Sequence, residues 1–423
     1  MSTKTFQLRC FLIKVPFDNW EPNMNWGKST YFDDISGQIA IVGIGESDYS
    51  GPSGRDSLRI SSQAVERAIV DSGLSPNKID GVMYSGYLPA QYDSSVHRKH
   101  FGLSGDIWDS NQGGGMVWAA TAPYQAAKAL YSGQANYIVN SFAVDWATKR
   151  PVMTGGPGAW HASELIKSQL EIPFGWFPQP IYFATFAMRH MHEYGTTPEQ
   201  LGELAVAFRS HANKNPNALM REKMLTMDDY LDSPTLADPL RMEDCCLISD
   251  GGAAYIMTTP ERARDMKQPH VIVEGVGHGI INNAPYISQQ RDITYTPQIF
   301  SAPGAFAMAD VKPEDIDVLA VYDCFSITAL MQIEDMGFCK KGEGGAFVEG
   351  GRLRYDRPRS RGGLPTNTHG GLLSHAYVLG IAHVIELVKQ LRGTSPNQVE
   401  AAEIAAYAGF TADEASTLIM RKP

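Results

Sequence analysis

The sequence predicts an α/β protein built from two similar halves, and three observations support this. Short apolar runs rich in β-branched residues alternate with segments of helical periodicity, as in proteins with buried parallel strands. Three elements of the first half recur in the same order in the second half. The 40 glycines and 25 prolines indicate the many turns that such a chain needs.

The first half begins with IAIVGIG (39–45), a β-branched run that ends in glycines and predicts a strand. SLRISSQAVERAIVDSGL (57–74) has apolar residues at helical spacing and a glycine stop, so it predicts a helix. A capped turn and a second strand follow in SPNKIDGVMYSG (75–86). The Ala-rich segment 117–133 predicts a second helix, and ANYIVNSF (135–142) predicts the next strand.

The second half repeats this plan. HVIVEGVGHG (270–279) resembles the first strand, and KPEDIDVLAVYD (312–323) shares Pro-x-x-Ile-Asp with the turn and strand at 75–86. The segment 370–393 repeats the glycine-rich loop and long helix of 113–133. Helices that end at glycine occur in all α/β proteins, but the matched order of three elements favours a duplication.

These repeats divide the chain into three regions. Residues 1–37 form an N-terminal extension that either packs on a surface or is a disordered tail, and residues 38–268 and 269–423 form the two halves. The first half contains an insertion at about 143–243, and Thr196 to Glu199 within it read as the start of a capped helix. A long insertion after a core strand is usually a functional cap or lid.

Composition and charge argue against several classes of protein. The formal net charge of -10 argues against nucleic-acid binding. No run of 18 apolar residues is present, so we expect no membrane span, and the N-terminus lacks the zones of a signal peptide. Five cysteines without CxxC spacing argue against a metal site and favour a cytoplasmic location. The pair His190 and His192 has no third ligand at metal spacing.

Four motifs give the chain a family resemblance. They are YGTTPEQLGELAVAFRSHANKNPNA (194–218), DCCLISDGGAA (244–254), YDCF (322–325) and LPTNTHGGLLS (364–374). Together and in this order they resemble the thiolase superfamily, and within it the sterol-carrier-protein or lipid-transfer-protein branch, from Ile39 to the end. The resemblance implies a thiolase fold of five layers, α-β-α-β-α, made of two fused halves with an inserted cap, and usually a dimer.

The cysteines of the thiolases are missing from this chain. None occurs between residues 10 and 245, and the family's nucleophile position falls at Met116 by ungapped counting from the helix end. If the glycines are aligned instead, it falls near Gln112 or Gly113. The stretch that would hold the second cysteine reads AAYAGFTADEAS (405–416), so covalent acyl transfer lacks both of its sulfurs.

Two tyrosines stand where the family has histidines. Tyr322 replaces the histidine of the HDCF motif, and Tyr377 replaces that of the GHPxG motif. A phenol is a general acid at neutral pH, and it becomes a base only where the site stabilises the phenolate. We predict Tyr377 as the base and Tyr322 as the acid. His375 either polarises a phenol or is a loop histidine bonded to backbone.

An acid–base pair without a nucleophile fits retro-aldol cleavage of a β-hydroxyacyl-CoA. A base takes the hydroxyl proton, the Cα–Cβ bond breaks, and a ketone or aldehyde is released with a shorter acyl-CoA such as propionyl-CoA. An oxyanion hole must stabilise the enolate. The residues expected to bind the enolate or the substrate are Asn367, Gly370, Gly371, Gln112, Gly113, Met116, Trp176 and Phe177.

The acyl group is expected to be bulky. The segment PFGWFPQPIYFATFAM (173–188) suits a wide apolar cleft for a polycyclic or aryl group, although packing of the cap or a dimer contact would also explain it. The resemblance to thiolase-like steroid side-chain aldolases implies a homodimer core that binds a small OB-fold and zinc-ribbon partner, as a heterotetramer. Coenzyme A enters as part of the substrate thioester, and no tightly bound cofactor or metal is expected.

Two alternatives stay open. The chain could be a thiolase-type acyltransferase with an unrecognised nucleophile, for which Cys324 in the YDCF motif is the candidate. It could also be a catalytically silent scaffold that binds acyl-CoA or lipid. Two tyrosines at the positions of catalytic histidines argue against the scaffold.

Overall fold

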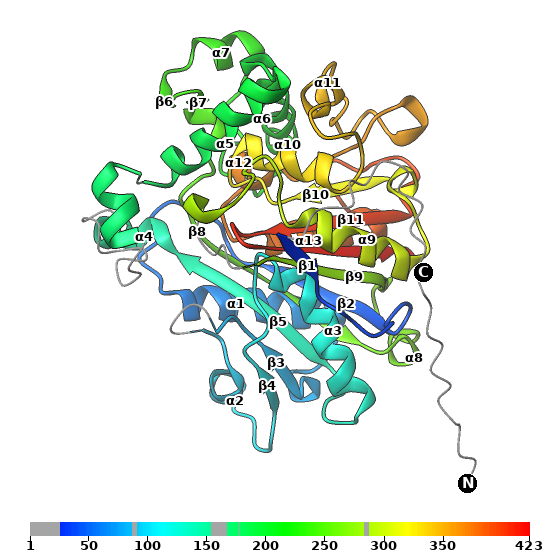
Figure 1. The fold of residues 1–423 in the computed structure, drawn as a ribbon. Helices are drawn as coiled ribbons and strands as arrows, with labels where there is room; N and C mark the ends of the chain where they lie inside the picture. Colours follow the sequence, from blue (N-terminus) through cyan, green and yellow to red (C-terminus); the bar gives the residue numbers. More distant parts are fainter. Residues whose placement is uncertain (1–25, 87–90, 154–166, 177, 283–286) are drawn as a thin grey trace.

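The computed structural model describes residues 26–86, 91–153, 167–176, 178–282 and 287–423. At its centre lies one ten-stranded sheet (Figure 1). Its strands are β1 (Gly27–Ser29), β2 (Ile39–Glu46), β3 (Gly81–Met83), β4 (Trp108–Ser110), β5 (Ile138–Asp145), β8 (Asp250–Thr258), β9 (Val271–Ile281), β10 (Val318–Val321), β11 (Ile404–Phe410) and β12 (Glu414–Arg421).

The strand order shows the duplication directly. The sheet runs β10-β11-β12-β9-β2-β8-β5-β3-β4, and β1 pairs with β9. The first half contributes β2-β8-β5-β3, and the second half contributes β9-β12-β11-β10 in the same spatial order. The antiparallel pairing of β2 with β9 joins the two halves.

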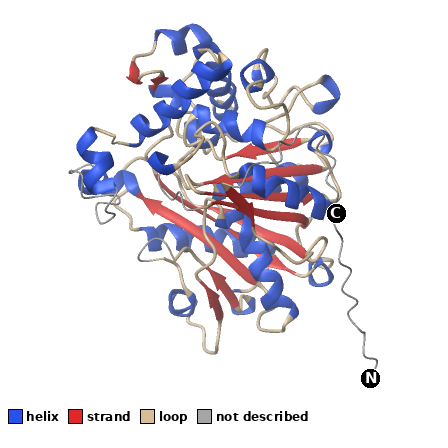
Figure 2. Cartoon of the chain, in the orientation of Figure 1, coloured by secondary structure: helices blue, strands red, loops and turns tan. Residues whose placement is uncertain are grey.

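Helices lie around the sheet (Figure 2). They are α1 (Ser57–Ser72), α2 (Ser94–Phe101), α3 (Trp118–Tyr131), α4 (Trp146–Met153), α5 (Gln179–Tyr194), α6 (Pro198–Ala212), α7 (Met227–Asp232), α8 (Pro260–Ala263), α9 (Gln298–Ala309), α10 (Ser326–Asp335), α11 (Gly344–Val348), α12 (Gly371–Ser374) and α13 (Ile381–Arg392). Helix α1 packs on the first half-sheet and α9 on the second, while α3 and α13 contact each other and strands of both halves. The predicted α-β-α-β-α layering of a thiolase fold is therefore confirmed.

Local sequence signals explain where the core helices begin and end. Asp56 caps the N-terminus of α1 by accepting a hydrogen bond from the Arg59 N–H, and Gly73 ends the helix with a positive φ of 73°. The predicted helix within 370–393 is divided. The short helix α12 is followed by a loop, and the long helix begins only at Ile381.

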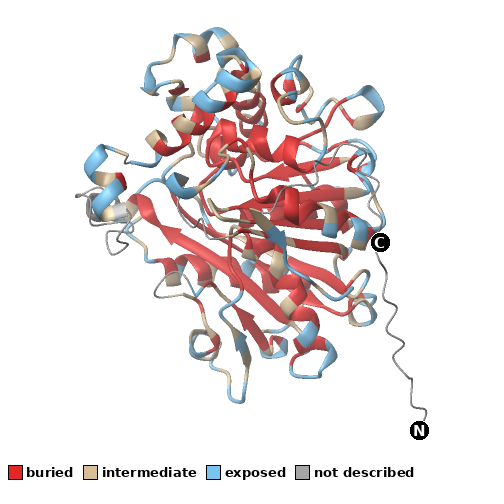
Figure 3. Ribbon diagram, in the orientation of Figure 1, coloured by how far each residue is buried: buried red, intermediate tan, exposed pale blue. Residues whose placement is uncertain are grey.

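The insertion forms a cap of helices on one side of the sheet. It contains α4 to α7 and a two-stranded sheet of β6 (Thr235–Ala237) and β7 (Leu240–Arg241). Thr197 caps α6 in a capping box with Gln200, as the Thr-Thr-Pro-Glu signal predicts. The sheet and the central helices are buried, whereas the outer faces of the cap are exposed (Figure 3).

The predicted N-terminal extension is only partly described. Residues 1–25 lie outside the described residues. The rest includes β1, which pairs antiparallel with β9 from Gly27 opposite Ile281 to Ser29 opposite Gly279.

Candidate active site

The two predicted catalytic tyrosines meet in the structure. Tyr322 follows β10, and Tyr377 lies in the loop between α12 and α13. Their hydroxyl oxygens are 3.1 Å apart, and both side chains are buried. This distance is that of a hydrogen bond in which either hydroxyl can donate.

The Tyr322 main chain is fixed on both sides. Its N–H donates to the carbonyl of Ala408 on β11 at 3.0 Å, and its carbonyl accepts from Nε2 of Gln332 on α10 at 2.8 Å. Burial, followed by the neighbouring Tyr377 and Cys324, raises the pKa of the Tyr322 phenol well above its ordinary value. Tyr322 therefore remains a neutral hydrogen-bond donor at physiological pH.

Tyr377 is held by a serine and an aromatic ring. The Tyr377 N–H donates to Ser249 Oγ at 2.9 Å, and Ser249 Oγ lies 3.2 Å from the Tyr377 carbonyl, to which it donates. The ring of Trp146, the first residue of α4, lies 5.1 Å from the Tyr377 ring between centroids. The cap therefore begins in direct contact with a predicted catalytic residue.

Of the three candidates for the family's nucleophile position, Met116 lies against the loop that carries Tyr377. Its backbone has a positive φ of 52°, which is uncommon outside glycine. The Met116 N–H donates to the carbonyl of Leu379, and its own carbonyl accepts from the Tyr407 hydroxyl at 3.0 Å. A side chain at Gly409, in the stretch of the missing second cysteine, would collide with the Met116 carbonyl.

Gln112 and Gly113 lie earlier in the same loop. Gln112 pairs with Ser85 in an isolated bridge, and the Gly113 N–H donates to the carbonyl of Tyr84. These contacts extend the edge of the sheet, so both residues have a structural role in this arrangement.

Asn367 and Gly370 use their donors to build the loop. The Asn367 side chain accepts from the Val321 N–H at 2.9 Å and donates to the Val321 carbonyl at 3.0 Å. The Gly370 N–H donates to the Asn367 carbonyl at 2.8 Å. These hydrogen bonds hold the loop against β10, and the role of Asn367 and Gly370 in an oxyanion hole stays a prediction.

Gly371 lets the loop approach a buried carboxylate. A side chain at this position would lie 2.0 Å from Asp323 Oδ2. Asp323 accepts hydrogen bonds from the N–H groups of Leu372 and Leu373, and its Oδ1 lies 3.0 Å from His383 Nε2. Asp323, next to Tyr322 in the sequence, thus fixes the start of α12.

His375 does not polarise a catalytic phenol in this structure. It is fully buried, and neither ring nitrogen has a hydrogen-bond partner among the described residues. Its ring packs edge-on against Tyr49 and His369, and Nε2 lies 4.0 Å from Glu46 Oε1. Burial lowers the pKa of His375 to about 4, so its imidazole is neutral.

The alternative nucleophile Cys324 is a poor thiolate. It is buried, and burial raises the pKa of its thiol to about 12. Its Sγ lies 3.6 Å from Thr328 Oγ1. Reactive cysteines have a lowered pKa, so the structure gives no activated thiol at this position.

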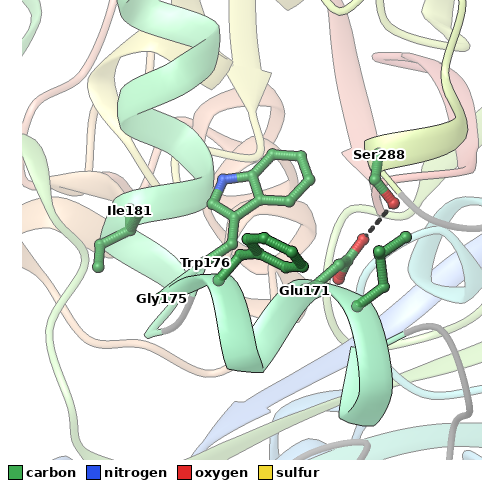
Figure 4. A pocket seen from close by; sticks show the side chains of 7 residues that line it. Glu171, Gly175, Trp176, Ile181 and Ser288 are labelled. Carbon is green, nitrogen blue, oxygen red and sulfur yellow. Dashed lines mark hydrogen bonds between the residues drawn. The ribbon is translucent and has the colours of Figure 1, made fainter.

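Of the predicted substrate residues in the cap, Trp176 lines a pocket of about 460 Å³, and Phe177 lies outside the described residues. Figure 4 shows Trp176 with Glu171 and Ser288 in this pocket. The neighbouring helix α5 reaches the catalytic loop, because Phe183 stacks on Phe325 with centroids 4.4 Å apart.

Neither a metal cluster nor a membrane helix is found in the described parts of the chain. No group of three or more His, Cys, Asp and Glu side chains there could hold a metal ion. None of the described helices combines the length and apolar character needed to span a bilayer. His190 instead contacts Thr196 at 2.7 Å and Glu334 at 3.0 Å.

Sequence reasoning missed three residues that shape the site, namely Trp146, Ser249 and Tyr407. Trp146 follows directly after strand β5, and Ser249 belongs to the motif at 244–254. Tyr407 lies in the stretch of the missing second cysteine, which was the one available signal for it. Only the folded chain shows which groups of the site these side chains reach.

Comparisons with known proteins agree with the fold. Residues 279–422 match the family described as "Thiolase C-terminal domain-like". The steroid side-chain-cleaving aldolase of Thermomonospora curvata is 34% identical over 86% of this chain and 93% of its own length. The 17-hydroxy-3-oxo-4-pregnene-20-carboxyl-CoA lyase of Mycobacterium tuberculosis is 34% identical over 91% of this chain and all of its own.

Two further similarities complete the comparison. The solved structure of the Ltp2-ChsH2(DUF35) aldolase has a TM-score of 0.81, is 32% identical, and covers 92% of this chain and 99% of that chain. An acetyl-CoA acetyltransferase of Methanothermobacter thermautotrophicus is 33% identical over 86% of this chain and 94% of its own length. Relatives of similar identity therefore include an acyltransferase as well as lyases, so the residues at the site carry weight beside sequence identity.

Proposed function

Because this chain belongs to the thiolase-fold aldolases, which are carbon–carbon lyases, we propose that it cleaves a bulky β-hydroxyacyl-CoA by a retro-aldol reaction between Tyr322 and Tyr377. The observation that carries the proposal is the 3.1 Å contact between the two hydroxyl oxygens. The raised pKa of the buried Cys324 thiol supports it against acyl transfer.

In the proposed reaction the tyrosine pair begins with one proton missing. Tyr377, as the phenolate, takes the proton from the β-hydroxyl group, and Tyr322 stabilises this phenolate by donating its hydroxyl hydrogen. The β-carbon becomes a ketone or aldehyde as the Cα–Cβ bond breaks, and the electron pair passes to the enolate of the thioester.

Tyr322 then gives its proton to the enolate carbon. The proton that Tyr377 received passes across the contact between the hydroxyls and restores the starting state. The atoms and electrons balance, because the substrate divides into a carbonyl compound and a shorter acyl-CoA without oxidant, reductant or free coenzyme A.

The finer features of the proposal follow the relatives. The names of two relatives refer to steroid side chains and to a pregnene carboxyl-CoA, which supports a steroid-type acyl group and propionyl-CoA as the short product. The name of the Ltp2-ChsH2(DUF35) aldolase supports a DUF35 partner for this chain. We propose that this partner is the small OB-fold and zinc-ribbon protein expected from the resemblance, bound to a homodimer of this chain. The four described cysteines are free thiols, which supports the expected cytoplasmic location.

A direct test uses a tertiary β-hydroxyacyl-CoA and mass spectrometry, with the purified chain alone and with its copurified partner. Release of a short acyl-CoA and a ketone in the absence of free coenzyme A is the expected result. A strict requirement for free coenzyme A would instead establish a thiolase reaction. Binding of the substrate without either product would establish a scaffold.

A further inference from the structure

A buried carboxylate at the start of β8 joins the cap to the loop before α1. Asp250 is fully buried, and its Oδ2 accepts hydrogen bonds from the N–H and the hydroxyl of Ser53, both at 2.8 Å. The Thr148 hydroxyl on α4 donates to the same oxygen at 2.5 Å, and the Thr148 N–H donates to Oδ1 at 3.0 Å. One side chain therefore holds two segments that are 95 residues apart in the chain.

Thr148 also binds the loop directly. Its hydroxyl oxygen accepts from the N–H groups of Ser53 at 3.1 Å and Gly54 at 2.9 Å, while its hydrogen goes to Asp250. Burial works to raise the pKa of Asp250, but the hydrogen bonds from Thr148 and Ser53 outweigh it and leave the pKa below its ordinary value. Hydrogen bonds to an ionised carboxylate are stronger than neutral ones, so this contact is a firm one.

A second carboxylate lies directly opposite the first. In the antiparallel ladder of β5 and β8, Asp145 is paired with Asp250. Like charges in opposite positions of neighbouring strands are destabilising. Helix α4 compensates with two consecutive residues, because Thr148 donates to Asp250 and Lys149 Nζ lies 2.8 Å from Asp145 Oδ2. The first turn of the cap is therefore matched to both strand ends.

Trp146 lies between these two attachments. Strand β5 runs directly into α4 (Figure 1), so Trp146 follows Asp145 and precedes Thr148 by two residues. The Trp146 side chain is buried and packs on the Tyr377 ring, with 5.1 Å between the ring centroids. Because the main chain is fixed on both sides of Trp146, Asp145 and Thr148 set the direction in which its ring points.

The residues on either side of Asp250 contact the loop that carries Tyr377. Ser249 Oγ is hydrogen-bonded to the Tyr377 main chain. Gly251 makes room for the next residue of that loop, because a side chain at Gly251 would lie 3.0 Å from Val378 Cγ1. Residues 249–251 therefore bear on the Tyr377 loop together, two of them directly and Asp250 through the cap.

We propose that Asp250 and Thr148 form a latch that holds Trp146 against Tyr377 and thereby fixes the position of the phenol. Both are positioning residues, because they act on Tyr377 through Trp146. The inference rests on the proposed lyase function and adds the first turn of the cap to the residues on which its turnover depends.

The variant Thr148→Val keeps the size of the side chain and removes its hydroxyl. In turnover of a β-hydroxyacyl-CoA, kcat should fall about tenfold with little change in KM, because the phenol is less well placed. Thr148→Ser keeps the hydroxyl and should retain kcat to within about twofold. An unchanged kcat in Thr148→Val would overturn the inference.

The opposite ends of the same strands provide matched controls. Thr258, the last residue of β8, is fully buried, and its hydroxyl donates to the Asn136 carbonyl at 2.7 Å. Thr258→Val should therefore lower the unfolding temperature about as much as Thr148→Val and leave kcat unchanged. Asp250→Asn is a second site variant, and Asp80→Asn is its control.

Asp80 is a suitable control because it also joins two segments by accepting several hydrogen bonds. It accepts from the N–H groups of Asn136 and Tyr137 at 2.7 and 2.8 Å and from the Asn136 side chain at 2.7 Å, just before β5 begins. We expect kcat to fall in Asp250→Asn and to stay unchanged in Asp80→Asn. An equal loss of kcat in the two variants would contradict the latch.

A double-mutant cycle tests whether the latch acts through Trp146. In a Trp146→Leu background, Thr148→Val should change kcat by about twofold or less, because the ring that the latch holds is already absent. The same tenfold loss in both backgrounds would show that Thr148 acts by another route, and it would overturn the inference.

Hydrogen–deuterium exchange of the full chain gives a readout that needs no turnover. Thr148→Val should speed the exchange of the main-chain amides of residues 375–380, whereas Thr148→Ser and Thr258→Val should not. Unchanged exchange in this loop would overturn the latch. Faster exchange in a chain that cleaves no acyl-CoA would support the latch and reject the lyase proposal, so the two failures are distinguishable.

Discussion

The hydroxyl oxygens of Tyr322 and Tyr377 lie 3.1 Å apart, although the two residues are 55 positions apart in the chain. One is fixed by strand β10 and the other by a loop clamped to Ser249. Two phenols at this distance are within hydrogen-bonding range, so a proton can pass from one hydroxyl to the other. The first prediction follows from this contact.

Replacement of either tyrosine by phenylalanine should reduce cleavage roughly 100- to 10,000-fold, because each change removes a proton-transfer group and keeps the ring. Single-turnover release of short acyl-CoA is the measurement, with circular dichroism to verify the fold. Tyr131→Phe is the control, because Tyr131 is 54% exposed and its hydroxyl donates only to the Gln38 carbonyl among the contacts described. Near-normal turnover in both site variants would reject the mechanism.

The state of the thiol at position 324 provides a second prediction. With the pKa of Cys324 raised to about 12 by burial, it is protonated at neutral pH and takes no part in the proposed chemistry. Cys324→Ser should therefore keep cleavage within a few-fold of the unaltered chain. Loss of all turnover in this variant, or an acyl group found on Cys324 by mass spectrometry, would instead support acyl transfer.

Ser249 should act as a positioning residue for Tyr377. Ser249→Ala removes both hydrogen bonds to the Tyr377 main chain and should lower the free energy of unfolding by about 1–3 kcal/mol. The turnover rate kcat should fall about tenfold with little change in KM, because the phenol is less well placed. Ser301→Ala, another fully buried serine that contacts Thr417, should cost similar stability and leave kcat unchanged. Equal kcat values in the Ser249→Ala and Ser301→Ala variants would contradict a positioning role for Ser249.

The buried histidines predict how stability depends on pH. Burial lowers the pKa of His375 and of His211 to about 4, below the ordinary value of 6.5. Between about pH 6.5 and 4 the unfolded chain binds protons that the folded chain does not, so the free energy of unfolding must fall as the pH falls through this window. Each fully buried imidazole contributes up to roughly 3 kcal/mol to this loss.

His375→Phe tests the contribution of one such group. The ring nitrogens of His375 have no hydrogen-bond partner among the described residues, so phenylalanine should cost little stability at pH 7. Chemical unfolding across pH 7 to 4 should show a smaller loss for the variant than for the unaltered chain. An identical loss in both proteins would show that His375 is not kept neutral by the fold.

The sequence was most informative where one residue determines the local structure. Gly73 and Gly133 stop helices because they adopt positive φ values of 73° and 76°, and the prediction placed both stops correctly. The sequence did not predict where the chain breaks before α13. At this break Leu379 has a positive φ of 51°, which is unusual for a leucine and so has no signal in the sequence. Its carbonyl accepts from the Met116 N–H, and such a long-range contact has no local signal.

Long-range contacts also limited what the sequence could predict about the candidate site. The family motifs identified Tyr322 and Tyr377, since each stands at a fixed offset from a glycine or cysteine of its motif. The orientation of His375 depends on Glu46 and Tyr49, which are more than 300 residues away in the chain. No periodicity or spacing in one sequence reports such a contact.

The pairing of β2 with β9 has a consequence for how a substrate enters. Ile39, Ala40 and Ile41 lie opposite Val273, Ile272 and Val271, so the halves share a main-chain ladder at the middle of the sheet. A motion that separates the two halves would have to break the β2–β9 hydrogen bonds. It would also have to break the contacts of α3 and α13 with the strands of one half. Under the proposed function, a substrate would therefore have to reach the tyrosine pair without separation of the two halves.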